Sequence, residues 1–156
     1  MRKKVLTVLS VAIVAVLVGV SAGPVMAAPP MDVHFESVAT IGGGPDPFTA
    51  SGSAVDAGTV CPSGDIELLS NTISGPPGGS FRILHVMKRF ICDDSSGTFD
   101  VKMTVRLDTT TGYTTARWKV TDGTGDYARL KGNGSLAGTP VVLGSSILDV
   151  YDGRVH

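Results

Sequence analysis

Apolar and polar residues alternate without interruption over residues 99–107. Apolar side chains occupy every odd-numbered position and polar ones every even-numbered position, which is typical of a β-strand with one buried face and one wet face. A turn-forming run follows at residues 109–112, and the alternation then resumes over residues 114–120 with the opposite parity. The pattern therefore predicts a β-hairpin of two half-buried strands.

The length of that turn also predicts the register of the hairpin. A loop of four residues pairs Asp108 with Tyr113. Counting back from that pair places Met103 opposite Trp118, and both then lie on the apolar face. The strand pattern and the turn length thus agree on which side chains enter the core.

Further strands are predicted with weaker alternation. They cover residues 33–41, 48–55, 66–73, 80–92, 134–138 and 147–155, separated by runs rich in Gly and Pro. Residues 126–131 suit a single turn of helix. About eight short strands need cover for their edges and apolar faces, which a closed barrel provides. We therefore expect an all-β fold, a single closed antiparallel barrel of about eight strands, with a two-sheet sandwich as the alternative.

The strand at 80–92 leaves the orientation of its polar side chains open. Apolar residues share one parity at positions 81, 83, 87 and 91, and His85 and Arg89 fall on the same parity. That parity predicts that both project into the barrel, where His can exchange protons and Arg can hold a carboxylate. If the hairpin loop after this strand is one residue longer or shorter in effect, the register shifts and Arg82 and Lys88 lie inside instead. The candidate ligand-binding residues are His85, Arg89, Trp118 and Tyr151, the last on a strand face shared with Asp149.

The N-terminus has the three parts of a secretory signal peptide. Basic residues 2–4 precede an apolar run over residues 5–20, and small residues at positions 25 and 27 favour cleavage after Ala27. The alternative is a membrane anchor, but the run is shorter than the roughly 20 residues that span a bilayer. We expect a signal peptide at 1–27, a flexible segment at 28–31, a barrel domain at 32–156 and a secreted protein.

The charge balance argues against nucleic acid as a partner. The chain has 13 basic and 14 acidic residues, and signal cleavage removes three basic residues and no acidic one. The remaining chain carries a formal charge of about −4, whereas phosphate binding needs a basic surface.

The predicted export also indicates the state of the two cysteines, Cys61 and Cys92. An even number in an exported chain favours a disulfide bond. Metal binding and a redox-active thiol pair are the alternatives. Two thiols without neighbouring histidines fall short of a zinc site, and the spacing of a redox pair is absent.

A glycine-rich segment follows the predicted hairpin at residues 118–134. Its glycines permit a tight turn and then a return to extended chain. Tyr127 and Leu130 are three residues apart, so we expect them to fold together as a plug over one end of the barrel. The turn motif comprises Gly123, Thr124, Gly125, Tyr127, Gly132 and Gly134.

The motif Gly-Thr-Gly-x-Tyr followed by Leu-x-Gly-x-Gly resembles the signature of the allene oxide cyclase and dirigent-like barrels, in particular small secreted bacterial members. The resemblance extends from Phe90 to the C-terminus. It implies an allene-oxide-cyclase-like barrel of eight antiparallel strands, often oligomeric. In the characterised enzymes, the lumen guides cyclisation or coupling of a hydrophobic substrate.

These observations lead to three functional hypotheses. The first is a secreted barrel that binds a small apolar ligand in its lumen. The second is a cyclase or isomerase that acts on a hydrophobic substrate without a cofactor or metal. The third is a non-catalytic extracellular interaction module. In each case we expect no stable membrane anchor after signal cleavage, and a homo-oligomer is compatible with all three.

Overall fold

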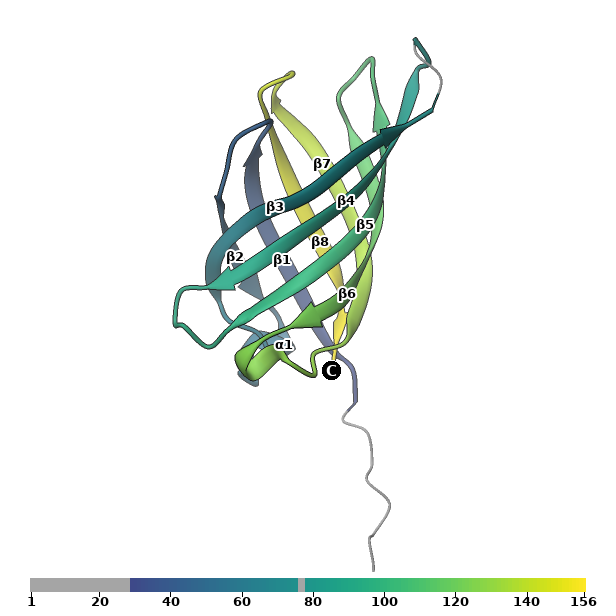
Figure 1. Cartoon of the computed structure of the whole chain (residues 1–156). Helices are drawn as coiled ribbons and strands as arrows, with labels where there is room; N and C mark the ends of the chain where they lie inside the picture. Colours follow the sequence, from purple (N-terminus) through teal and green to yellow (C-terminus); the bar gives the residue numbers. More distant parts are fainter. Residues whose placement is uncertain (1–28, 76–77) are drawn as a thin grey trace, which may run out of the picture.

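The computed structural model describes residues 29–75 and 78–156, which form a closed barrel of eight antiparallel strands (Figure 1). Each strand pairs with the next along the chain, and β8 pairs with β1 to close the barrel. The strands are β1 (Met31–Thr40), β2 (Asp46–Ser51), β3 (Ser63–Ser74), β4 (Phe81–Cys92), β5 (Thr98–Asp108), β6 (Thr114–Gly123), β7 (Gly132–Val142) and β8 (Ser146–Val155). The predicted all-β closed barrel is confirmed. The signal peptide expected at 1–27 lies outside the described residues.

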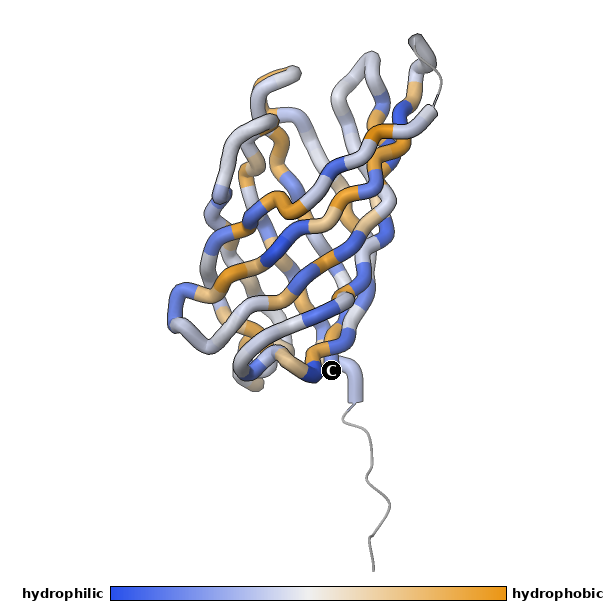
Figure 2. The backbone as a smooth tube through the Cα atoms, in the orientation of Figure 1, coloured by the Kyte–Doolittle hydropathy of each residue, from blue (hydrophilic) through white to orange (hydrophobic). Residues whose placement is uncertain are grey.

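The two ends of the barrel differ in what covers them. One end, here called the closed end, carries the helix α1 (Ser53–Asp56), the 3-10 turn η1 (Gly125–Tyr127) and the C-terminus (Figure 1). The other, here called the open end, carries the β1–β2, β3–β4, β5–β6 and β7–β8 hairpin loops. Hydrophobic and hydrophilic residues alternate along most of the strands between them (Figure 2).

The hairpin predicted from the alternation is present as β5 and β6. The amide of Asp108 donates a hydrogen bond to the carbonyl of Tyr113 at 2.9 Å. Met103 lies opposite Trp118, and both side chains are buried. The turn length and the hydrophobic pattern therefore fixed this register correctly.

The predicted interior face of the strand at 80–92 is wrong. In β4 the buried side chains include Val86 and Phe90, whereas His85 is exposed on the outer wall. Phe90 pairs with Phe99, and their rings stack with centroids 4.8 Å apart. Because paired residues share a face, alternation from Phe90 places Val86 and Lys88 on the inner face as well. This register is the alternative that turns Lys88 inward.

The predicted strand at 48–55 is also shorter than expected. It ends at Ser51, and residues 53–56 form α1. Gly52 has a φ of +105°, and a Cβ there would lie 2.7 Å from the carbonyl oxygen of Asp32. The chain therefore leaves the strand at a position that favours glycine.

The predicted plug is present at the closed end. Tyr127 and Leu130 are both buried, and the Leu130 amide donates to the Tyr127 carbonyl at 3.0 Å. The Tyr127 ring packs edge-on against Phe99, with centroids 5.5 Å apart. Gly125 has a φ of +57°, and a Cβ there would collide with the carbonyl oxygen of Ser96. The glycine is thus required by the turn that seats the plug.

The core fills the closed half of the barrel. Cys61 and Cys92 form the expected disulfide and are both buried. The largest side chains of the core are aromatic and contact one another, and they are Phe35, Phe48, Phe90, Phe99, Trp118, Tyr127 and Tyr151.

The barrel wall is incomplete toward the open end. The short strand β2 pairs with β1 over His34–Ser37 and with β3 over Ser63–Ile66. Beyond Ile66, residues 67–74 of β3 pair with β4 alone among the described strands. This segment of β3 is therefore a sheet edge, and all of its residues are exposed.

Candidate functional site

A polar cluster, formed by Lys88, Asp149 and Tyr151, lies inside the barrel. The ammonium Nζ of Lys88 donates to Oδ2 of Asp149 at 2.9 Å and to the Tyr151 hydroxyl oxygen at 3.0 Å. The Tyr151 hydroxyl also donates a longer bond, of 3.5 Å, to Oδ2 of Asp149. We call these three residues the lumen cluster.

The lumen cluster joins two strands that are not neighbours in the sheet. Lys88 comes from β4, and the other two residues come from β8. Tyr151 is 1% exposed, and its ring contacts Phe35 and Phe90 of the aromatic core. Asp149 lies two residues from Tyr151 on the same face of β8, toward the open end. The cluster therefore forms the boundary between the packed closed half and the open half of the lumen.

The surroundings of the cluster keep both of its proton donors protonated. Burial raises the pKa of Tyr151 to about 12. Burial by itself would lower the pKa of Lys88, but the neighbouring Tyr151 and Asp149 outweigh it and raise that pKa above its ordinary value. At neutral pH the cluster thus presents an ammonium and a neutral phenol beside a carboxylate.

Apolar side chains line the lumen between the cluster and the open end. Leu68 pairs with Lys88 and Ile73 pairs with Leu84, so alternation places all of these on the inner face. Yet Leu68 is 46% exposed and Ile73 is 63% exposed. Leu84, Leu107 and Ile147 face inward as well and are only partly buried. The same pairing turns Arg82 (opposite Leu107) and Asn71 (opposite Val86) inward, so the inner face here is accessible and largely, but not wholly, apolar.

The structure separates the four predicted ligand-binding residues. Tyr151 belongs to the lumen cluster, and Trp118 is buried in the core, where its indole Nε1 donates to the Ser135 carbonyl at 2.9 Å. Arg89 lies on the outer wall, where Nε and Nη2 donate to the two carboxylate oxygens of Asp100 at 2.8 and 2.9 Å. His85 is also on the outer wall.

Sequence reasoning missed Lys88 as a primary candidate because the register of β4 was misjudged. The signal was nevertheless present: Lys88 shares parity with Phe90 and Cys92, and a disulfide within the core requires the cysteine to point inward. The sequence does indicate Asp149, because it shares a strand face with Tyr151. That Lys88 meets it across the lumen depends on strand order and cannot be derived from local patterns.

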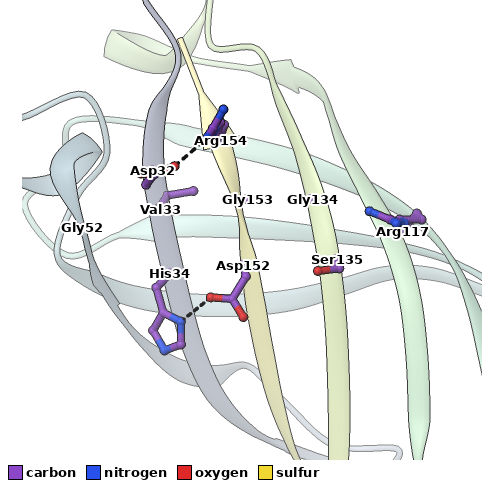
Figure 3. A pocket seen from close by; sticks show the side chains of 10 residues that line it. All are labelled: Asp32, Val33, His34, Gly52, Arg117, Gly134, Ser135, Asp152, Gly153 and Arg154. Carbon is purple, nitrogen blue, oxygen red and sulfur yellow. Dashed lines mark hydrogen bonds and ion pairs between the residues drawn. The ribbon is translucent and has the colours of Figure 1, made fainter.

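A second candidate is a hollow of about 440 Å³ on the outer wall (Figure 3). It is lined by Asp32, Val33, His34, Gly52, Arg117, Gly134, Ser135, Asp152, Gly153 and Arg154. Strand register brings four of the polar side chains into one row: Arg117 pairs with Ser135, Ser135 with Asp152, and Asp152 with His34. The hollow therefore lies across β6, β7, β8 and β1.

Carboxylates hold the imidazole of His34 in this hollow. Nδ1 lies 2.7 Å from Oδ1 of Asp152, and Nε2 lies 3.2 Å from Oε1 of Glu36. The hydrogen bond to Asp152 and the one to Glu36 raise the pKa of His34 above its ordinary value. All three side chains remain more than one-third exposed, so solvent screens their attraction. The hollow can bind a polar molecule at its surface, but its charged side chains are more exposed to solvent than those of Lys88 and Asp149 in the lumen cluster.

Across the described ranges 29–75 and 78–156, no three His, Cys, Asp or Glu side chains are grouped to hold a metal ion. None of the helices in this part of the chain is long and apolar enough to cross a membrane. In comparisons with known proteins, no family model, curated protein or solved structure matches the chain.

Proposed function

We propose that this protein is exported and binds a small, largely apolar molecule in the open half of its lumen, with a polar group of that molecule against the lumen cluster. The observation that carries the proposal is the Lys88–Asp149 ion pair at the boundary of a largely apolar interior. The buried disulfide supports export, because such bonds persist in oxidising compartments.

A stabilising role alone does not account for an ion pair at this position. Taking two charges out of water costs several kcal/mol per ion, and well-packed apolar residues of similar volume often stabilise a fold as well or better. The aromatic core directly below shows that the barrel can be filled by such residues. Perturbed, paired charges at the floor of an accessible apolar lumen are typical of a binding site.

The chemistry of the lumen constrains the ligand. Leu68, Leu84 and Ile147 offer an apolar wall, which suits a hydrocarbon or aromatic body. Lys88 is already neutralised by Asp149, so a full charge on the ligand would lack a partner within the lumen cluster. The polar group is therefore a neutral one, such as a hydroxyl or a carbonyl, which can accept a hydrogen bond from the ammonium.

A second candidate function is catalysis, in keeping with the resemblance to allene oxide cyclase and dirigent-like barrels. Its supporting observation is that two protonated donors, the Lys88 ammonium and the Tyr151 hydroxyl, converge on one oxygen, Oδ2 of Asp149, at 2.9 and 3.5 Å. Two donors aimed at one oxygen can stabilise negative charge that develops on it during cyclisation or isomerisation. This chemistry uses no cofactor.

Native mass spectrometry of protein recovered from culture supernatant tests export, the disulfide and a retained ligand together. We expect a chain that begins at Ala28, lacks two protons relative to the free thiols and carries a small neutral molecule. A chain that stays inside the cell with its first 27 residues uncleaved would contradict export.

Binding of the neutral fluorophore N-phenyl-1-naphthylamine tests the lumen directly. We expect Leu68→Gln to weaken binding about tenfold, because it places an amide in the apolar wall. Ile91→Gln is the matched control, because Ile91 is an exposed apolar residue of β4 near the closed end. Equal affinity in both variants, or no binding by the parent chain together with no retained molecule, would contradict the proposal. The variant Lys88→Met distinguishes ligand binding from catalysis. If it still binds the fluorophore but no longer converts a hydrophobic substrate that the parent chain converts, the result indicates catalysis.

A further inference from the structure

Exposed apolar side chains gather at the open end of the barrel. Six of them are between 53% and 68% exposed, and they are Ile41, Ile73, Tyr113, Val141, Val142 and Leu143. They come from the β1–β2, β3–β4, β5–β6 and β7–β8 hairpins, which all lie at this end (Figure 1). We call these six residues the apolar rim. Large exposed apolar groupings of this kind mark interaction surfaces.

Three of the loops that carry the rim contain no charged residue of their own. Residues 41–45, 109–113 and 141–145 contain no Asp, Glu, Lys or Arg. The side chain of Leu143 lies against Gly112, so the tips of the β5–β6 and β7–β8 hairpins touch. The rim is therefore a surface that loses little charge solvation when it leaves water.

The charges nearest the rim are the carboxylates of Asp46 and Asp108, which accept hydrogen bonds from backbone amides of the β1–β2 and β5–β6 hairpins, and the guanidinium of Arg106. The guanidinium of Arg106 lies 3.7 Å from the centroid of the Phe81 ring on the outer wall. Phe81 pairs with Asp108, whose amide closes the β5–β6 hairpin, so this Arg–Phe pair lies next to the rim. An apolar tip followed by an aromatic ring and a cation matches the order of layers in a bilayer, in which acyl chains give way to headgroup phosphates.

We propose that the open end docks reversibly on the surface of a lipid bilayer, with the apolar rim inserted below the headgroups. The hairpins protrude to unequal heights (Figure 1). Such hairpins enter a deformable layer of lipid more readily than they match a second rigid protein, whose stable interfaces bury about 800 Å² per partner with close complementarity. The uncharged loops favour zwitterionic lipid. This inference does not depend on a ligand in the lumen.

A site-specific fluorophore tests which part of the full chain enters the lipid. The environment-sensitive dye NBD is attached at Val142→Cys, and vesicles of phosphatidylcholine are added. We expect a blue shift, an increase in intensity of about twofold or more, and quenching by doxyl-labelled lipid. The control dye at Thr104→Cys, on the outer face of β5, should not respond. Vesicle binding through the apolar segment at 5–20 alone would leave both dyes unchanged and would overturn the proposal.

Substitutions in the rim give a second, label-free measurement. We expect Val142→Asn with Leu143→Asn to lower the fraction of protein that sediments with phosphatidylcholine vesicles about tenfold, and Ile91→Asn to leave it unchanged. Parent binding should persist in 0.5 M NaCl and should not increase with phosphatidylserine, because apolar insertion is not screened by salt. If the rim substitutions instead dissociate an oligomer seen by light scattering, with no change in vesicle binding, the rim is an interface between copies and the lipid proposal fails.

Discussion

At the scale of single residues, the unusual feature is a charged pair where an apolar one would pack. Lys88 and Asp149 have side chains that are 13% and 8% exposed, and each is satisfied chiefly by the other. Their mutual attraction offsets the free-energy cost of removing both charges from water. A single buried charge without its partner would have no such compensation. Removing one partner should therefore be worse than removing both.

We expect Lys88→Met to lower the free energy of unfolding by about 3–5 kcal/mol, because it leaves the Asp149 carboxylate buried without a cation. The double variant Lys88→Met, Asp149→Asn should recover part of that loss, with a coupling energy of about 1 kcal/mol or more. Urea denaturation followed by circular dichroism measures all members of the cycle. Strictly additive effects would show that the two side chains do not interact in solution.

The ionisation of Tyr151 should make the free energy of unfolding depend on pH in alkaline solution. Its folded-state pKa of about 12 exceeds the unfolded value near 10, so the folded state keeps the phenol proton that the unfolded state loses. Stability is thus intact below pH 10 and falls as the pH rises toward 12, by roughly 1–3 kcal/mol. The raised pKa of Lys88 acts in the same direction.

Absorbance at 295 nm should therefore show a tyrosine that ionises late, and Tyr151→Phe should remove that component. The variant should also show a shallower fall of stability between pH 10 and 12. A titration of the parent protein in which every tyrosine ionises together near pH 10 would contradict the burial of Tyr151.

At the scale of elements, the hairpin β5–β6 and the strand β4 show what local patterns can and cannot predict. The hairpin combines strict alternation with a turn whose length sets the pairing, so face and register both followed from the sequence. In β4, apolar residues occur on both parities, with Ile83 and Met87 on one and Val86 and Phe90 on the other. The inner face of β4 is selected by its partners, the stacked ring of Phe99 and the disulfide, which local spacing does not reveal.

That disulfide links the end of β4 to the connection between α1 and β3. It closes a loop between residues separated by 31 positions. We expect reduction to lower the free energy of unfolding by about 3–4 kcal/mol, because the cross-link restricts the unfolded chain. Denaturant midpoints with and without dithiothreitol measure the effect, and the Cys61→Ser, Cys92→Ser variant, which should not respond to dithiothreitol, is the control. Two titratable thiols in the native exported protein would contradict the bond.

At the scale of the whole molecule, the barrel divides into a stable half and an accessible half. The closed half holds the aromatic core, the plug and the disulfide. The open half holds exposed inward side chains and the unpaired edge of β3, because β2 is too short to complete the wall. The sequence predicted the number of strands, the closure and the plug. It did not predict this division, which follows from where β2 ends relative to the long strands on either side of it.

Hydrogen exchange should resolve the two halves. The amides of residues 67–74 that point away from β4 have no strand partner among the described residues, so they should exchange within seconds to minutes. The amides of β5, bonded to strands on both sides and packed on the core, should exchange only through global unfolding. A lumen ligand that lies against Leu68 should slow exchange in β3 without changing β5. Slow exchange throughout residues 67–74 in the ligand-free protein would mean instead that another chain covers this edge, because burial of side chains alone does not bond an amide.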